Sequence, residues 1–202
     1  MAIRVIKIEK LSHKRPRPSP RTEIVLIGLT PGKQQHLAIE KAASPRQGAF
    51  KGYMRKQMFE WFQKLRLSDY LDLEDEDTLF NDHYFSKRLF VTSLLREPVY
   101  IKQGSNFKNY SGRNPLPWHN AELLTMMQET LDLLDTLQNN CLVIPLGKVV
   151  SQAIKRFSEL DEYHFILHGF PHPSGANGHR GREFTENQRR LKKIVKEYFE
   201  SR

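Results

Sequence analysis

Two loops rich in glycine and proline carry the residues of this sequence that are best suited to chemistry. The first reads Gly28-Leu29-Thr30-Pro31-Gly32, and the second reads His172-Pro173-Ser174-Gly175-Ala176-Asn177. Glycine lets a backbone approach a ligand closely, and threonine or serine hydroxyls can orient water or bind phosphate. A neutral histidine can donate a hydrogen bond where negative charge develops in a reaction. We therefore expect the two loops to form one site.

Two other motifs are weaker candidates. Residues 28–33 resemble a phosphate-binding P-loop, but the glycine spacing is one residue short and Gln34 stands where serine or threonine would hold magnesium. His164, His168 and His172 are evenly spaced, but on a strand and its loop they do not converge on one point. We therefore expect no metal ion and no cofactor.

The elements that position the two loops follow from the apolar pattern. Residues 24–27, 89–93, 141–146 and 164–168 are predicted strands. Helices are predicted over residues 54–65, over 120–134 with Asn120 as the cap, from Lys148, and around 191–198. This alternation predicts an α/β fold, a three-layer sandwich with a central, mostly parallel four-stranded sheet. In such sheets ligands bind at the carboxyl ends of the strands, where both loops lie.

The charge of the chain favours a polyanionic partner. Among 202 residues, 32 Lys and Arg stand against 23 Asp and Glu, which gives a net charge of +9 and suits DNA or RNA. Residues 69–77 hold six acidic side chains and are expected to be a solvated loop. Residues 1–22 are predicted to be a basic, proline-rich arm that either contacts phosphates or is simply solvated, and residues 23–202 a single domain.

Several classes of protein are excluded by composition. No segment has the roughly 18 consecutive apolar residues of a membrane helix, and the first residues lack the apolar core of a secretory signal, so we expect a cytoplasmic protein with no membrane partner. A single cysteine, Cys141, excludes an internal disulfide framework, a cysteine-rich zinc site and an iron–sulfur cluster held by cysteines. Cys141 begins an apolar segment and is predicted to be a core residue. The protein is expected to be a monomer.

The order of these motifs resembles the uracil-DNA glycosylase superfamily over about residues 23–200. Residues 24–32 look like the first motif of that family, and Gln47-Gly48-Ala49-Phe50-Lys51-Gly52 is similar to its Gly-x-x-Phe-x-Gly segment. Residues 90–93 match the strand that reads the base, 142–147 the central strand and turn, and 172–177 the second motif. The resemblance implies a uracil-DNA glycosylase-like fold, DNA as the partner, and hydrolysis of a base–sugar N-glycosidic bond.

The resemblance also implies roles for particular residues. Thr30 and His172 take the catalytic positions, with His172 donating a hydrogen bond to the departing base. The positions that contact the base are Gly28, Leu29, Pro31, Gly32, Phe50 and Ser93. The Phe50 ring stacks on the extruded base or is an ordinary core aromatic, and His172 is catalytic or is a loop histidine satisfied by backbone groups.

DNA contacts are expected from the second loop and the residues after it. The Ser174 hydroxyl and the amides that follow can bind phosphates, and one of the small or polar side chains can insert into the duplex as the base leaves. The predicted DNA-binding residues are Ser174, Gly175, Ala176, Asn177, His179, Arg180 and Arg182.

The sequence departs from the family pattern where water is activated. Active branches have Asp or Asn at the position of Thr30 or Glu at that of Leu29, and one branch has Asp at that of Tyr53. A threonine hydroxyl can orient water but is not a base near neutrality. Ser93 replaces the asparagine that reads uracil, so altered specificity is expected. Substitute water-positioning groups are Gln34, Gln35, His36 and Glu40, among which the sequence does not choose.

The sequence thus predicts a DNA repair protein that binds DNA and hydrolyses a base–sugar bond weakly or with altered base specificity. One alternative is a non-catalytic nucleic-acid-binding module on the same fold. Another is an enzyme that acts on free nucleosides or another small glycosidic substrate in the same pocket.

Overall fold

The centre of the protein is a four-stranded parallel sheet, seen in a computed structural model that describes residues 6–11, 17–42, 50, 52–81, 87–138 and 140–202. The strand order is β3-β2-β6-β7, and every neighbouring pair is parallel. The strands are β2 (Ile24–Gly28), β3 (Leu89–Ser93), β6 (Leu142–Pro145) and β7 (Phe165–Ile166). All four strands were predicted, but β7 is shorter than predicted because the chain turns at His168, whose N–H donates to the Ile166 carbonyl.

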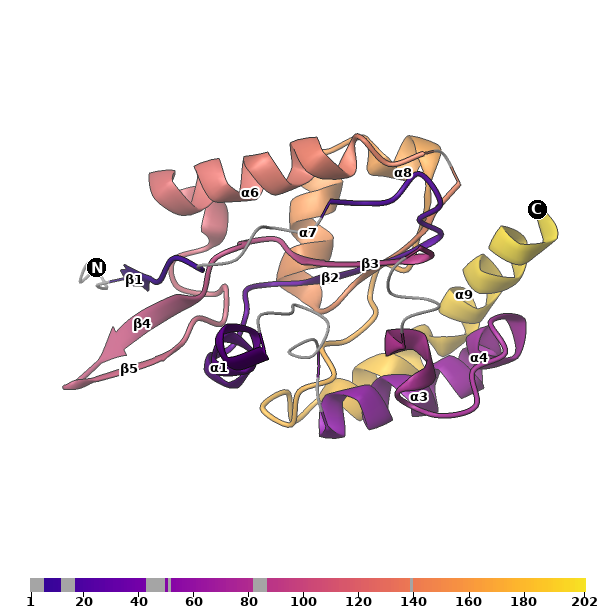
Figure 1. The fold of residues 1–202 in the computed structure, drawn as a ribbon, viewed down its shortest axis with the longest axis horizontal. Coiled ribbons are helices and arrows are strands. Elements are labelled where there is room, and N and C mark those ends of the chain that lie inside the picture. The colour runs from indigo at the N-terminus through magenta and orange to yellow at the C-terminus, as the bar shows by residue number, and fades with distance from the viewer. Residues whose placement is uncertain (1–5, 12–16, 43–49, 51, 82–86, 139) are drawn as a thin grey trace.

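Helices cover both faces of this sheet, as Figure 1 shows. Alternate side chains of β2 point to opposite layers: Ile24 and Leu26 belong to one core cluster, and Val25 and Ile27 to the other. The first cluster includes side chains of α3 (Tyr53–Leu65), α4 (Leu67–Tyr70) and α9 (Arg180–Glu200). The second includes side chains of α6 (Ala121–Leu134), α7 (Lys148–Phe157) and α8 (Leu160–Tyr163). The predicted three-layer α/β sandwich is therefore confirmed.

The predicted helices are present where the apolar spacing placed them. The helix over residues 120–134 begins as predicted, because the Asn120 side chain accepts a hydrogen bond from the Leu123 N–H at 3.0 Å. Helix α1 (Lys33–Ala42), which follows the first loop, was not predicted. In the described part of the chain no helix is both long and apolar enough to cross a membrane.

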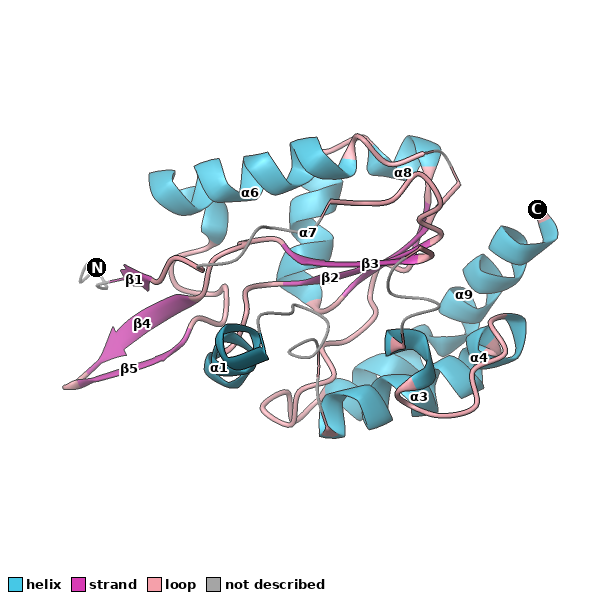
Figure 2. Ribbon diagram, viewed as in Figure 1, coloured by secondary structure: helices cyan, strands magenta, loops and turns pink. Residues whose placement is uncertain are grey.

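A second sheet, which was not predicted, projects from the main body (Figures 1 and 2). It is antiparallel in the order β1-β4-β5 and is formed by β1 (Ile6–Ile8), β4 (Val99–Gln103) and β5 (Asn106–Asn109). Strand β1 lies inside the predicted N-terminal arm, where Ile6 and Ile8 pair with Ile101 and Val99. Residues 1–5 and 12–16 of that arm lie outside the described residues. Both described parts of the arm contact the domain: β1 pairs with β4, and the carbonyl of the buried Thr22 accepts a hydrogen bond from the Cys141 thiol.

The acidic run at residues 69–77 is mostly exposed, as expected, but it is also locally ordered. Asp75 Oδ1 accepts hydrogen bonds from the N–H groups of Asp77 and Thr78, at the start of a short 3-10 helix, η1 (Thr78–Phe80). Asp77 pairs with Arg55 of α3 at 2.5 Å. Leu73, within the run, is buried. The run therefore serves as a connection that is packed on α3.

Candidate functional site

The carboxyl ends of β2, β3 and β6 bring the two predicted loops to one edge of the sheet. Gly28 pairs with Ser93, and the pairing continues as the Leu94 and Leu95 N–H groups donate to the Gly28 and Leu29 carbonyls at 2.8 Å. Directly after β6, the Gly147 N–H donates to the Phe170 carbonyl at 3.0 Å, which places the segment before His172 beside it. The juxtaposition expected from the sequence is thus present.

Three of the predicted base-contacting residues meet at Gly28. A Cβ atom added to Gly28 would lie 3.5 Å from the Ser93 hydroxyl oxygen and 3.6 Å from two ring carbons of Phe50. The Phe50 ring is 4 % exposed and meets Phe80 edge to face. Phe50 is therefore a core aromatic whose ring edge reaches the end of β2. The Gln47–Ala49 and Lys51 part of its motif lies outside the described residues.

The His172 ring is held by a backbone hydrogen bond within the second loop. His172 Nδ1 accepts a hydrogen bond from the Ser174 N–H at 3.2 Å, so in the neutral ring the proton is on Nε2. Burial lowers the pKa of His172, because the charged ring would lose hydration. A Cβ on Gly147 would lie only 3.2 Å from the His172 Cβ, and Gly147 has φ of 95°, so glycine permits this close approach.

Thr30 lies in the first loop, and its hydroxyl is already hydrogen-bonded to two backbone groups. Its Oγ1 donates to the Glu97 carbonyl at 2.8 Å and accepts from the Val99 N–H at 3.0 Å, which fastens the first loop to the connection between β3 and β4. One lone pair of the oxygen remains. Among the neighbouring predicted residues, Leu29 packs against the core formed with α6 and α7, and Pro31 is buried.

The predicted substitutes for a water-positioning group have different surroundings. Gln35 Oε1 accepts from the Gly32 N–H at 3.1 Å, so this side chain braces the first loop. His36 contacts the Tyr100 hydroxyl at 3.2 Å and the Glu9 carboxylate at 3.1 Å. Gln34 is exposed, and the side chain of Glu40 lies outside the described residues. Gln35 thus has its partner within the first loop, whereas His36 has its partners on the side of the antiparallel sheet.

The residues predicted to contact DNA divide into two groups. Asn177 and Arg180 bind within the protein: Asn177 Nδ2 donates to Glu183 at 3.0 Å, and Arg180 donates to the Tyr53 hydroxyl at 2.8 Å and to the Asn177 carbonyl at 3.0 Å. These bonds tie the second loop to α3 and α9. Ser174 Oγ accepts from the Ala176 N–H within the loop. The exposed members, which a partner can reach, are Gly175, Ala176, His179 and Arg182.

Two residues that sequence reasoning missed hold the first loop in place. Asn109 of β5 accepts a hydrogen bond from the Lys33 N–H at 3.1 Å through its Oδ1. Glu97, whose carbonyl binds Thr30, is 5 % exposed, and its Oε2 accepts from the Leu11 N–H at 2.7 Å. Both contacts join segments more than 60 residues apart in sequence, and no local pattern marks them.

The other histidines and the cysteine have separate structural partners. His164 Nδ1 accepts from the Cys141 N–H at 3.2 Å, whereas His168 lies between the Ser151 hydroxyl and the Asp161 carboxylate, each at 2.8 Å. Cys141 is buried, and burial raises the pKa of its thiol to about 11. The prediction that Cys141 is a core residue is confirmed.

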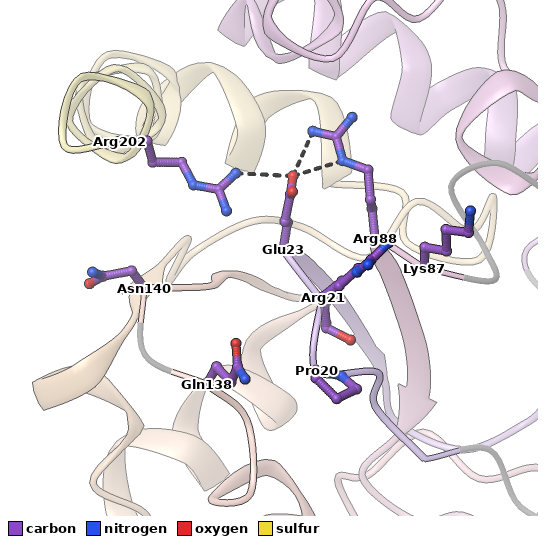
Figure 3. Close-up of a pocket in the computed structure, with 9 residues that line it drawn as sticks. Pro20, Arg21, Glu23, Lys87, Arg88, Gln138, Asn140 and Arg202 are labelled. Carbon is purple, nitrogen blue, oxygen red and sulfur yellow. Dashed lines mark hydrogen bonds and ion pairs between the residues drawn. The ribbon is translucent and has the colours of Figure 1, made fainter.

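A pocket of about 420 Å³ lies at the opposite, amino edge of the sheet (Figure 3). At its wall Glu23 Oε2 accepts hydrogen bonds from the guanidinium groups of Arg88, at 2.5 Å, and Arg202, at 3.0 Å. Burial raises the pKa of Glu23, but the two arginines outweigh this effect and hold the pKa below its usual value. The network links the starts of β2 and β3 to the end of α9.

The fold and the site define an α/β protein whose polar loops meet at the carboxyl edge of a four-stranded parallel sheet. No family model matches the sequence. The uncharacterized protein YoxB of Bacillus subtilis (strain 168) is 31% identical over 195 residues, which cover 87% of this chain and 73% of YoxB. The chain belongs to the same family as YoxB. A crystal structure of Pedobacter heparinus SMUG2 is similar over 90% of this chain and 74% of its own chain, with 11% identity and a TM-score of 0.44.

Proposed function

We propose that the protein is a uracil-DNA glycosylase-like DNA repair enzyme that hydrolyses a base–sugar bond with weak or altered base specificity. The observation that carries this proposal is the meeting of the two motif loops at one edge. Phe50 and Ser93 face Gly28, and the neutral His172 lies beside Gly147 at the end of the adjacent strand. An enzyme of this kind extrudes the nucleotide, binds the base in a pocket, and stabilises the charges that develop.

The base contacts explain why specificity is expected to be weak. A base placed beside Gly28 would meet the Phe50 ring edge and the Ser93 hydroxyl. A hydroxyl rotates and can donate or accept, whereas an amide presents a donor and an acceptor in one fixed plane. Ser93 can therefore bind a base that presents either a hydrogen-bond donor or an acceptor to it. The shape of the base then determines specificity more than hydrogen bonding does.

In the proposed reaction His172 stabilises the departing base. The C–N bond breaks with its electron pair going to the base, and the oxygen of a water molecule bonds to the sugar carbon and releases a proton to solvent. The Nε2–H of His172 donates to the base as negative charge develops there. Because burial lowers the pKa of His172, the ring stays neutral near pH 7 and needs no proton uptake to act.

Thr30 limits the rate of this reaction. The Thr30 hydroxyl donates a hydrogen bond to the Glu97 carbonyl and accepts one from the Val99 N–H. It can accept one more hydrogen bond from water, but it cannot remove a proton. A positioned general base contributes roughly 10²–10⁴-fold to such rates, so we expect slow turnover. The same observation favours the second candidate function, a non-catalytic nucleic-acid-binding module.

Base release and DNA binding separate the two candidates. Oligonucleotides carrying uracil, hypoxanthine, xanthine or an alkylated base are incubated with the protein and cleaved with alkali, and binding is measured as salt is raised. Strand cleavage on any of them supports the enzyme. No cleavage, with DNA binding that weakens as salt rises, supports the binding module. Binding that does not respond to salt contradicts both.

A further inference from the structure

One face of the antiparallel β1-β4-β5 sheet carries two aromatic rings and two lysines. The register pairs Lys7 with Tyr100, Tyr100 with Asn109, and Lys102 with Phe107. Paired residues point to the same side of a sheet, and side chains alternate along each strand. These five side chains therefore share one face, while Ile6, Val99 and Ile101 lie on the other face.

The outer part of this face is exposed and basic. Phe107 is 44% exposed, and the Lys7 ammonium lies 5.8 Å from the centre of its ring. Glu9 pairs with Lys7 at 2.5 Å, but among the described residues no carboxylate pairs with Lys102. The sequence has no acidic residue from Pro98 to Ala121. An exposed aromatic ring on the same face as an unpaired lysine is a surface that suits bases and phosphates.

The inner part of the same face leads directly to the candidate site. Asn109 accepts a hydrogen bond from the Lys33 N–H, and its Nδ2 lies 3.5 Å from the place of a Cβ on Gly32. Tyr100 contacts His36 of α1. In Figure 1 the hairpin extends outward from the end of the main sheet where β2 and α1 meet. A strand lying on the hairpin would therefore continue toward the two motif loops.

We propose that this face, defined by Lys102 and Phe107 at its outer end, binds a single-stranded segment of DNA next to the candidate site. An unstacked base lies on the Phe107 ring, and Lys102 neutralises a neighbouring phosphate. A paired base has its faces covered by its neighbours, so stacking on Phe107 selects single strands over intact duplex. The inference rests on the proposed function, because it places the DNA strand that the two motif loops act on.

The test compares binding of a fluorescent 12-nucleotide single strand and of the matching duplex. Phe107→Leu keeps an apolar side chain but removes the ring, and we expect it to weaken single-strand binding by roughly 5- to 100-fold, with duplex binding within about twofold. Tyr163→Leu is the matched control, since Tyr163 is 50% exposed on α8, and it is expected to bind both forms as the wild type does. Lys102→Gln is expected to lower the salt dependence of single-strand binding by about 0.7 in logarithmic slope.

The outcomes separate this inference from the proposed function. If the wild type binds DNA and Phe107→Leu binds single strands equally well, the hairpin face is not the binding surface, and the proposed function stands. If Phe107→Leu weakens the binding of single-stranded and duplex DNA equally, the inference that this face selects single strands is wrong. If the wild type binds neither form, the inference and the proposed function both fail. Equal melting temperatures of the variants show that a loss of binding is not unfolding.

Discussion

Replacing Thr30 by valine tests whether its hydroxyl fastens the first loop. Valine keeps the branched shape, so the substitution removes the hydrogen bonds to the Glu97 carbonyl and the Val99 N–H without opening a cavity. Each such bond contributes a net 0.5–1.5 kcal/mol, so the free energy of unfolding should fall by about 1–3 kcal/mol. For a chain of this length each kcal/mol lowers the melting temperature by roughly 2–4 °C, which gives a decrease of roughly 2–12 °C.

The assay is thermal and urea denaturation of Thr30→Val, Thr30→Ser and Thr125→Val. Serine keeps the hydroxyl and should recover most of the loss. Thr125 is exposed on α6, where its hydroxyl donates to the Ala121 carbonyl, and its replacement should change stability by less than about 0.5 kcal/mol. If Thr30→Val has the same melting temperature as the wild type, the two hydrogen bonds to the backbone do not hold the loop. Our interpretation of Thr30 as mainly structural would then be wrong.

Three further predictions concern the site, the core and the amino edge. Gly28→Ala should fold normally, because its Cβ makes ordinary contacts of 3.5–3.6 Å. The same Cβ should block base release by filling the space beside Phe50. Unchanged base release would mean that the base binds elsewhere. Cys141 should react with a thiol reagent only after unfolding, and rapid native labelling would contradict its burial. The pKa of Glu23 in the folded protein lies below its unfolded value near 4.5. Its contribution to the stability of the fold is therefore present above about pH 4.5 and is lost as pH falls through the folded pKa. Glu23→Gln should remove this pH dependence of stability in acid denaturation.

The pH profile of base release gives a separate test of His172. In the proposed reaction the neutral ring is the active form, and burial holds the pKa of His172 below the usual 6.5. The rate should therefore stay level as pH falls through 6.5 and should decline only at lower pH. A rate that rises as pH falls through 6.5 would instead require the charged ring.

The main sheet could be predicted from sequence because its strands are continuous apolar runs. Residues Ile24–Ile27 are fully buried on both faces, and such runs carry a strong local signal. The antiparallel sheet carries no such signal: all four residues of β5 are exposed, and β1 is three residues long inside a proline-rich basic segment. Strand β1 is specified by pairing with β4, more than 90 residues away, which a local pattern does not report. Strand β5 follows β4 directly in a hairpin, but its four exposed residues show no apolar alternation.

The same distinction applies to the candidate site. The Gly28 and Ser93 pairing followed from the motif order, since carboxyl ends of neighbouring parallel strands meet. The bonds of the Thr30 hydroxyl did not, because their partners come from a connection 67 and 69 residues away. Arg180 shows a different limit: its charge predicts a DNA contact, but no local pattern predicts the hydrogen bonds of its guanidinium to the Tyr53 hydroxyl and to two loop carbonyls. The number of charged residues can be counted from the sequence, but the groups that each charged side chain contacts depend on the fold.

The most direct test of the central claim is single-turnover base release by His172→Ala compared with His119→Ala. His119 is exposed on the 3-10 helix η2 (Pro117–His119), so its loss controls for removing a histidine. The substrate is whichever damaged or deaminated base the wild type releases. We predict that His172→Ala is slowed about 10²-fold or more and that His119→Ala matches the wild type. Equal release by the two variants, or no release by the wild type from any substrate, would contradict the assignment of this edge as the site of base–sugar hydrolysis.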